Sequence, residues 1–200
     1  MGQKASKLNL TDIYQLRNET LFTEEEIKEF HRDFLKNHPS GKMTQADLQK
    51  LYMKVFPRGD PSQLVSQIFR IYDTDKNGVI DFREFLCVIS IISNGPSEAK
   101  LKLAFDLYDQ DGSGYISQDE FQSILMASLF CQGAQKAVGA LTSQPTGMCS
   151  GSESTPAAAA RVTFQHMDSN RDNKVSFEEF ADYSKRDPTL ISLMNLAGGR

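Results

Sequence analysis

The sequence has no apolar run long enough to cross a lipid bilayer, which takes about 20 predominantly apolar residues. Its longest apolar stretch, FLCVISIIS at 85–93, is short and is interrupted by cysteine and serine. We therefore expect any contact with a membrane to be peripheral.

Cysteine is also scarce. Cys87, Cys131 and Cys149 are an odd set without zinc-ligand spacing, and no secretory leader precedes them. A disulfide framework is therefore not expected, whereas a cytoplasmic, reducing location is. The cysteines and the three histidines form no recognisable catalytic arrangement, so we do not expect an enzyme.

Positive charge is in short supply. The net charge of the 200-residue chain is -4, and no local basic patch stands out, so nucleic-acid binding is not expected. The acidic residues gather in short loops instead. With 40% hydrophobic residues, the chain can still build one good-sized domain or two small lobes.

Three 12-residue segments follow one template. They are DTDKNGVIDFRE at 73–84, DQDGSGYISQDE at 109–120 and DSNRDNKVSFEE at 168–179, called here the second, third and fourth loops. Oxygen-bearing side chains stand at positions 1, 3 and 5, an aliphatic residue at position 8 and glutamate at position 12. This pattern is typical of the EF-hand calcium loop.

The chemistry of calcium explains these positions. The ion takes six to eight oxygen ligands at about 2.3–2.6 Å, and short side chains on alternate residues of a tight loop can converge on one point. Position 7 contributes its carbonyl, position 9 acts directly or through water, and position 12 is bidentate. The candidate ligands are Asp73, Asp75, Asn77, Val79, Asp81 and Glu84; Asp109, Asp111, Ser113, Tyr115, Ser117 and Glu120; and Asp168, Asn170, Asp172, Lys174, Ser176 and Glu179.

The fourth loop differs from the second and third loops at position 6. Gly78 and Gly114 permit the sharp turn there, whereas the fourth loop has Asn173, which visits the left-handed region more easily than most residues. Arg171 and Lys174 add positive charge nearby. We expect a weaker fourth site, two or three bound Ca²⁺ ions in total, and Mg²⁺ as an alternative occupant of the weaker sites.

Helical patterns flank the three loops. Apolar residues at helical spacing precede each loop. Ser117 with Glu120, and Ser176 with Glu179, form capping-box patterns that open the exit helices. Each loop is therefore expected between two helices.

A fourth repeat lies one step upstream, because EF-hands pair through a short strand at position 8 and the second loop needs a partner. The first loop, KNHPSGKMTQAD at 36–47, aligns Gly41 with Gly78 but lacks the ligands. Lys36 would repel a cation, Pro39 stiffens the loop, and Asp47 is shorter than glutamate. We expect a non-binding hand kept for packing, with His38 as a solvent-facing loop residue.

The predicted fold class is therefore all-α: four EF-hands in two paired lobes, with short antiparallel β contacts between loops. The Gly-Pro pair in SNGPS separates the lobes. The expected parts are an N-terminal segment at 1–22, lobes at 23–93 and 97–184, a Gly-, Ser- and Ala-rich flexible insertion at 131–160, and a C-terminal tail at 185–200.

The chain begins MGQKASKL, which matches the M-G-x-x-x-[ST] context for N-myristoylation of Gly2. Together with the PSG of the first loop, FPRGDPSQ at 56–63, IDFREF at 80–85 and SKRDP at 184–188, this start resembles the neuronal calcium sensor family. That family comprises EF-hand proteins of the hippocalcin, visinin-like, neurocalcin, frequenin and recoverin type.

The resemblance implies four EF-hands with the first inactive, N-myristoylation, and calcium-controlled binding to membranes and target proteins. It also implies a groove in the first lobe, used by the fatty acid or by a target helix and lined by Phe30, Tyr52, Phe56 and Phe85; the alternative is that these aromatics are simply core. Guanylate cyclase, kinase and ion channel targets all stay open. The implied location is cytoplasmic, with calcium-dependent peripheral attachment to membranes.

Two alternative hypotheses about the function stay open from the sequence alone. The acyl group could stay exposed, which would make the protein a constitutively anchored sensor. Alternatively, the protein could be a calcium buffer without targets, whose EF-hands bind ions yet barely open.

Overall fold

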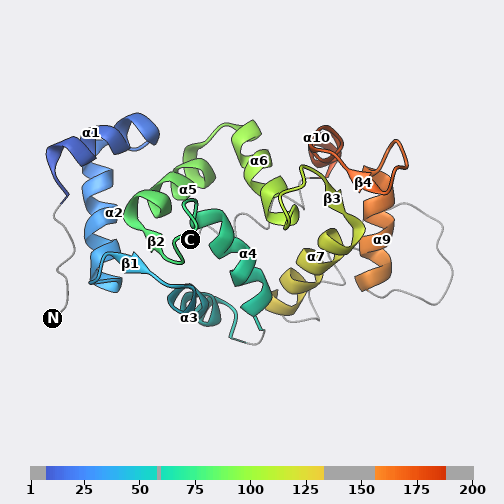
Figure 1. The fold of residues 1–200 in the computed structure, drawn as a ribbon, viewed down its shortest axis with the longest axis horizontal. Helices are drawn as coiled ribbons and strands as arrows, with labels where there is room; N and C mark the ends of the chain where they lie inside the picture. Colours follow the sequence, from blue (N-terminus) through green and yellow to red (C-terminus); the bar gives the residue numbers. More distant parts are fainter. Residues whose placement is uncertain (1–7, 58–59, 133–155, 188–200) are drawn as a thin grey trace.

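The computed structural model describes residues 8–57, 60–132 and 156–187. The described chain is helical apart from two small antiparallel pairs of strands (Figure 1), which confirms the all-α class and the short β contacts between loops. None of the described helices is long and apolar enough to cross a membrane.

The elements carry the labels of Figure 1. The first half contains α1 (Leu10–Glu19), α2 (Glu24–Asn37), β1 (Lys42–Met43), α3 (Gln45–Val55), α4 (Ser62–Tyr72), β2 (Ile80–Asp81) and α5 (Phe82–Asn94). The second half contains α6 (Ser97–Tyr108), β3 (Ile116–Ser117), α7 (Gln118–Gln132), α9 (Pro156–Met167), β4 (Lys174–Val175) and α10 (Phe177–Arg186).

The loops pair through their strands. Met43 of β1 lies opposite Ile80 of β2, and Ile116 of β3 lies opposite Val175 of β4. These are the four residues at position 8, and all of them are buried. Each pair of loops is therefore held together by backbone hydrogen bonds and by two apolar side chains directed into the core.

The same capping device starts the helix after every loop. The position 9 side chain accepts the position 12 N–H, while the position 12 carboxylate accepts the position 9 N–H. The serine boxes were predicted, and Thr44 with Asp47 and Asp81 with Glu84 form equivalent boxes. Such a box satisfies two N–H groups that have no partner within the helix.

The two halves share one continuous cluster of buried side chains. In its centre α4 packs against α6 and α7 (Figure 1). Polar contacts cross the same boundary: Arg70 donates to the carbonyl of Asp106 at 2.5 Å, and Gln67 Nε2 donates to Gln110 Oε1 at 3.0 Å. The largest fully buried side chains are Tyr108, Phe105, Phe121, Phe164, Phe180, Ile27, Leu64, Ile68, Ile80, Leu86, Leu107 and Ile116.

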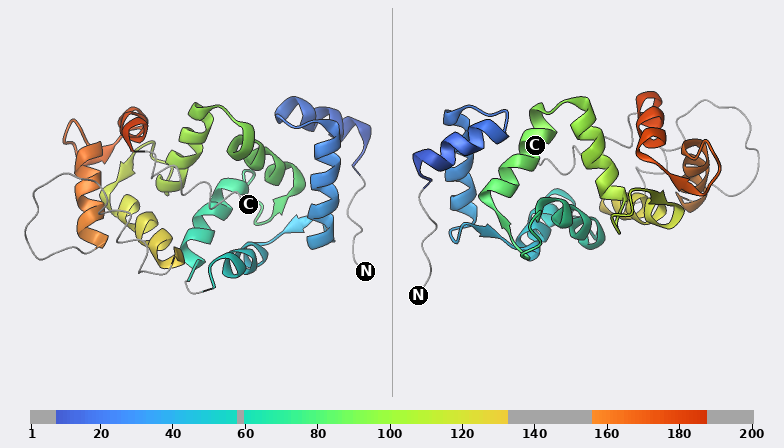
Figure 2. Two further views of the ribbon diagram at one scale, coloured as in Figure 1. Left: turned by 180° about the vertical axis from the view of Figure 1, so that it is seen from behind. Right: turned by 45° about the horizontal axis from the view of Figure 1, so that its top comes forward.

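Helix α1 was not anticipated within the segment 1–22. Asn9 and Asp12 form a capping box at its start, and Ile13 and Leu16 are buried. The helix contacts α2 and α5 and lies at one end of the molecule, far from α9 and α10 (Figure 2).

Two helices run beyond boundaries expected from the sequence. Helix α7 continues through Gln132 and α9 begins at Pro156, so both reach into the segment 131–160 that was expected to be an insertion. The alanine run at 157–160 has high helix propensity, proline is well tolerated at a first helical position, and α9 packs against α7. Similarly, α10 extends to Arg186, two residues into the expected tail. The rest of the insertion, the last 13 residues of the tail and Gly2 lie outside the described residues.

Replacing Tyr108 by phenylalanine is expected to raise the free energy of unfolding in chelator by about 1 kcal/mol. The Tyr108 hydroxyl is fully buried and has no hydrogen-bond partner among the described residues, whereas its ring stacks on Phe121 with centroids 5.3 Å apart. Urea denaturation measures the change. The control Tyr115→Phe removes an exposed hydroxyl and should stay within about 0.5 kcal/mol of the parent. A less stable Tyr108→Phe variant would contradict the expectation.

Candidate metal centres

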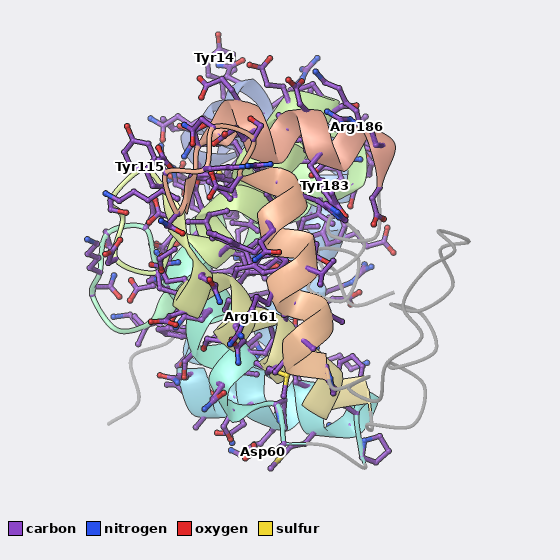
Figure 3. The ribbon with its side chains drawn as sticks, turned by 90° about the vertical axis from the view of Figure 1, so that its right-hand side faces the viewer. Tyr14, Asp60, Tyr115, Arg161, Tyr183 and Arg186 are labelled. Carbon is purple, nitrogen blue, oxygen red and sulfur yellow. The ribbon has the colours of Figure 1, made fainter. Side chains whose placement is uncertain are left out.

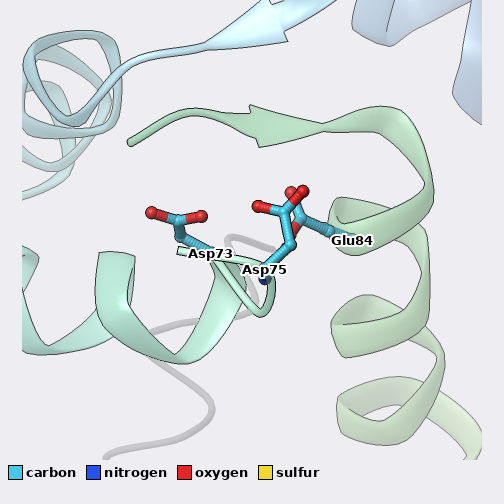
Figure 4. Close-up of side chains that lie close together, drawn as sticks. All are labelled: Asp73, Asp75 and Glu84. Carbon is cyan, nitrogen blue, oxygen red and sulfur yellow. The ribbon is translucent and has the colours of Figure 1, made fainter. Parts of the chain in front are cut away.

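Carboxylates converge in the second and third loops. Asp73 caps the C-terminus of α4, Asp75 lies in the loop, and Glu84 lies in the first turn of α5. One oxygen from each carboxylate lies within 4.8 Å of the others, and the three groups face one another (Figure 4). The third loop brings its equivalents together in the same way, namely Asp109, Asp111 and Glu120.

The position 1 carboxylate shapes the turn. Both oxygens of Asp73 accept N–H bonds, from Asn77 and from Gly78, at 2.9 Å each. Asp109 and Asp168 make the same pair of bonds, at 2.9–3.1 Å. The first ligand is therefore held in place by the loop's own backbone before any ion is considered.

Position 3 is oriented equally well by aspartate and by asparagine. Asp75 Oδ1 accepts the Asn77 N–H at 3.0 Å, and Asn170 Oδ1 accepts the Asp172 N–H at 2.9 Å. The amide oxygen of Asn170 thus takes the place of a carboxylate oxygen in the fourth loop. It supplies the same geometry with one negative charge fewer.

The position 12 carboxylate joins the exit of each loop to its entrance. In the second loop, Glu84 Oε2 accepts the Asp81 N–H at 3.0 Å, while Oε1 accepts the N–H groups of Thr74 and Asp75 at 2.9 and 3.3 Å. Glu120 and Glu179 repeat this arrangement. A carboxylate offers about four lone-pair sites, and the three bonds to Glu84 already occupy three of them. A bidentate metal contact would therefore have to displace a bond from the loop entrance to Oε1.

Hydrogen bonds also keep loop carboxylates ionised. A hydrogen bond from Ser113 holds the pKa of Asp111 below its ordinary value. Burial acts to raise the pKa of Glu179, but hydrogen bonds from Ser176 and Ser169 outweigh burial and lower that pKa. Ionised carboxylates at neutral pH suit a divalent cation.

The backbone turns left-handed at two places in each of the second, third and fourth loops. At position 6, Gly78 and Gly114 have φ of 81° and 84°, and Asn173 adopts φ of 62°, as expected for asparagine. At position 4 the φ values are 58° for Lys76, 71° for Gly112 and 62° for Arg171. The requirement at position 4 was missed, because lysine and arginine give no sequence signal for a conformation that costs them about 1–2 kcal/mol.

The first loop keeps the left-handed turn at position 6, where Gly41 has φ of 74°, but it lacks the turn at position 4. Helix α2 continues through Asn37 and is capped by His38, so Lys36 at position 1 lies in the helix and the loop is shortened. Pro39 occupies position 4, where the ring fixes φ near about -65° and forbids the left-handed turn. Asp47 caps α3 by accepting the N–H and the hydroxyl of Thr44.

The expectation of a solvent-facing His38 was wrong. The imidazole is half-buried, with its ring centroid 5.2 Å from that of Phe34, and burial lowers its pKa. The longer α2 brings position 3 of the first loop back onto the aromatic core, where it serves packing.

The structure also places predicted ligands at positions 9 and 7 of the loops. Asp81, Ser117 and Ser176 at position 9 are helix caps, and their contact with an ion stays a prediction. The Tyr115 carbonyl at position 7 accepts the Ser113 hydroxyl at 3.1 Å, which places two predicted ligands side by side.

The predicted groove residues lie in or against the core of the first half. Tyr52 is buried, and Phe30, Phe56 and Phe85 are half-buried and pack against the central cluster. The Phe85 ring lies 5.3 Å from Phe34 and 6.3 Å from Tyr72. An occupant of a groove lined by these residues would have to replace contacts between helices.

Comparisons with known proteins agree with this geometry. Residues 98–185 match the family described as an EF-hand domain pair, and residues 64–91 match the EF hand domain. The chain is 41% identical to Neuronal calcium sensor 1 of Lymnaea stagnalis and to that of Aplysia californica, in each case over 98% of this chain and 97% of the relative. It is 30% identical to human Recoverin, over 96% of this chain and 92% of the relative.

The variant Glu84→Gln is expected to lower the number of bound calcium ions by one, because the amide loses both the charge and the bidentate oxygen pair. Isothermal titration calorimetry measures the stoichiometry. The matched control Asp47→Asn changes position 12 of the first loop and should leave it unaltered. Unchanged stoichiometry in Glu84→Gln would remove the second loop from the binding sites.

Proposed function

Since the chain belongs to the neuronal calcium sensor family and is an EF-hand calcium sensor, we propose that calcium controls its attachment to membranes and to target proteins. In this proposal Gly2 carries a myristoyl group, and the second, third and fourth loops bind the ions. Ion binding releases the acyl group and opens the aromatic groove to a target helix.

The observation that best supports this proposal is a direct connection between the second loop and α1. Arg83, at position 11 and adjacent to Glu84, donates through Nε to Glu19 Oε2 at 2.8 Å and through Nη2 to Glu19 Oε1. The Leu21 N–H, just beyond α1, donates to Ser90 Oγ of α5 at 2.8 Å. A movement of α5 caused by an ion at Glu84 would therefore reach the helix that follows the acylation segment.

Magnitudes allow a reversible switch. A single myristoyl chain binds membranes only marginally, with a partition constant near about 10⁴ M⁻¹, and nearby lysines add about 1 kcal/mol each on an anionic surface. Turning a balance of roughly 1:99 into 99:1 takes about 5.5 kcal/mol. Two or three ions can supply it if each binds the open form roughly twentyfold to a hundredfold more tightly.

The proposed target site is the groove of the first half. Its aromatics come from α2, from α3 and its C-cap Phe56, and from α5. Rings of different helices meet, as Phe34 of α2 and Phe85 of α5 do at 5.3 Å. Separating such helices would expose an apolar strip of the kind that accepts the apolar face of a partner helix.

Sedimentation of the myristoylated protein with anionic vesicles tests the switch. Binding is expected in calcium and not in chelator, and Gly2→Ala should lose it because the acyl acceptor is gone. Equal binding in both conditions would mean a constant anchor. An apolar dye separates a sensor from a buffer: calcium should increase its fluorescence if the helices open, and an unchanged signal would favour a buffer.

The variant Arg83→Gln should raise vesicle binding in chelator by up to about fivefold. The pair between Arg83 and Glu19 joins α1 to the second loop. Because the pair is partly exposed, it contributes up to about 1 kcal/mol to this contact, which corresponds to about fivefold in an equilibrium. Arg32→Gln is the matched control, because Arg32 pairs with Glu29 inside the single helix α2. The exchange Arg83→Glu with Glu19→Arg should restore the parent's binding. Identical binding of Arg83→Gln and the parent in chelator would rule out this connection.

A further inference from the structure

Helix α1 has two apolar sides. One side packs Ile13 and Leu16 into the protein, where both are buried. A second side carries Leu10 and Tyr14, four residues apart on the same face, with exposed fractions of 80% and 67%. Figure 3 shows the Tyr14 side chain at the edge of the molecule, directed away from its body.

This exposure is unusual within the part of the chain that the structure describes. Leu10, Tyr14 and Leu21, the last at 60%, are its three most exposed large apolar side chains. Single exposed apolar residues are normal, but here the three extremes gather on one helix and the residue just after it. Side chains that serve only the core would lie on the same side of the helix as Ile13 and Leu16 and would be buried with them.

The charge of this region is opposite to that of the whole chain. Residues 1–19, which include all of α1, contain three cations, Lys4, Lys7 and Arg17, and two acids, Asp12 and Glu19, a net charge of +1, whereas the chain as a whole has a net charge of -4. Glu19 is paired with Arg83. The carboxylate of Asp12 is engaged in the capping box, with Oδ2 accepting the Asn9 N–H at 3.1 Å. Arg17 lies seven residues after Leu10 and three residues after Tyr14, which places it on the same side of the helix. Among the described residues, this side of α1 therefore combines the apolar Leu10 and Tyr14 with the cation Arg17.

From these observations we propose that α1 lies on anionic lipid, with Leu10 and Tyr14 inserted at the level of the headgroups. This contact extends the proposed function, since it is a second attachment beside the acyl chain on Gly2. One myristoyl chain needs a second signal for stable attachment, and a short amphipathic helix eight residues away can provide it. An acyl chain already in the bilayer keeps α1 at high effective concentration near the surface. Tyrosine suits the boundary because its ring is apolar and its hydroxyl is polar.

Vesicle sedimentation of the myristoylated full chain in calcium provides the first test. The double variant Leu10→Ser with Tyr14→Ser should bind vesicles of phosphatidylcholine and phosphatidylserine at least roughly tenfold more weakly than the parent, because two apolar side chains no longer leave water. The matched control is Leu51→Ser with Met53→Ser on α3, whose side chains are 43% and 49% exposed. It should bind like the parent. Mass spectrometry verifies acylation, and circular dichroism verifies the fold.

A tryptophan reporter measures insertion directly, because the chain contains no tryptophan. In Tyr14→Trp, anionic vesicles should shift the emission to shorter wavelength, and brominated lipid should quench it. In Val162→Trp on α9, another exposed apolar position, neither change is expected. Emission that stays unshifted in Tyr14→Trp while the protein is bound would overturn the proposal.

The outcomes separate this proposal from the acyl anchor. If Gly2→Ala loses binding while the Leu10→Ser, Tyr14→Ser variant binds like the parent, the anchor stands and the role of α1 is refuted. If Gly2→Ala binds like the parent while the double variant binds more weakly, the anchor fails and α1 stands. A dimer of the parent in solution that the double variant abolishes, without any loss of vesicle binding, would assign the face to a second copy and overturn the proposal.

Discussion

The structure of each binding loop depends on the carboxylate at position 12. Glu84, Glu120 and Glu179 each accept N–H groups from the first residues of the loop and from the residue before the exit helix. One side chain thus caps the exit helix and closes the loop on its entrance, and it is also the predicted bidentate ligand of the ion. A change in the position of this carboxylate would act on the exit helix, because Oε2 accepts the N–H group of the residue that caps it.

The first loop shows that strand pairing does not require the loop geometry of the other three hands. Met43 still pairs with Ile80 and is buried, so the first hand supports the second through the strand contact. Aspartate at position 12 is too short to reach the loop entrance, and Pro39 cannot adopt the left-handed turn at position 4. The loop consequently tightens, and α2 extends toward the aromatic core.

Connections between distant segments turn the four hands into one molecule. The contacts of Arg70 and Gln67 join α4 to the third hand, and Gln110, the partner of Gln67, also gives its N–H to Glu120. At the other end, the contact between Arg83 and Glu19 joins the second loop to α1. Both connections begin within or beside one of the second and third loops, so each loop is in contact with another hand or with the N-terminal helix.

The sequence by itself determined the loops, because their chemistry is local: the ligand spacing, the serine capping boxes and the turn at Asn173 all lie within 12 residues. It also indicated the pairing of Met43 with Ile80 through the repeat. Only the tertiary structure decided that α2 lengthens, that His38 is half-buried, and that Glu19 meets Arg83, 64 residues away. Likewise, α1 has an inner and an outer apolar side only once Ile13 and Leu16 have packed against the protein. These features depend on contacts between segments far apart in the chain, which neither spacing nor propensity encodes.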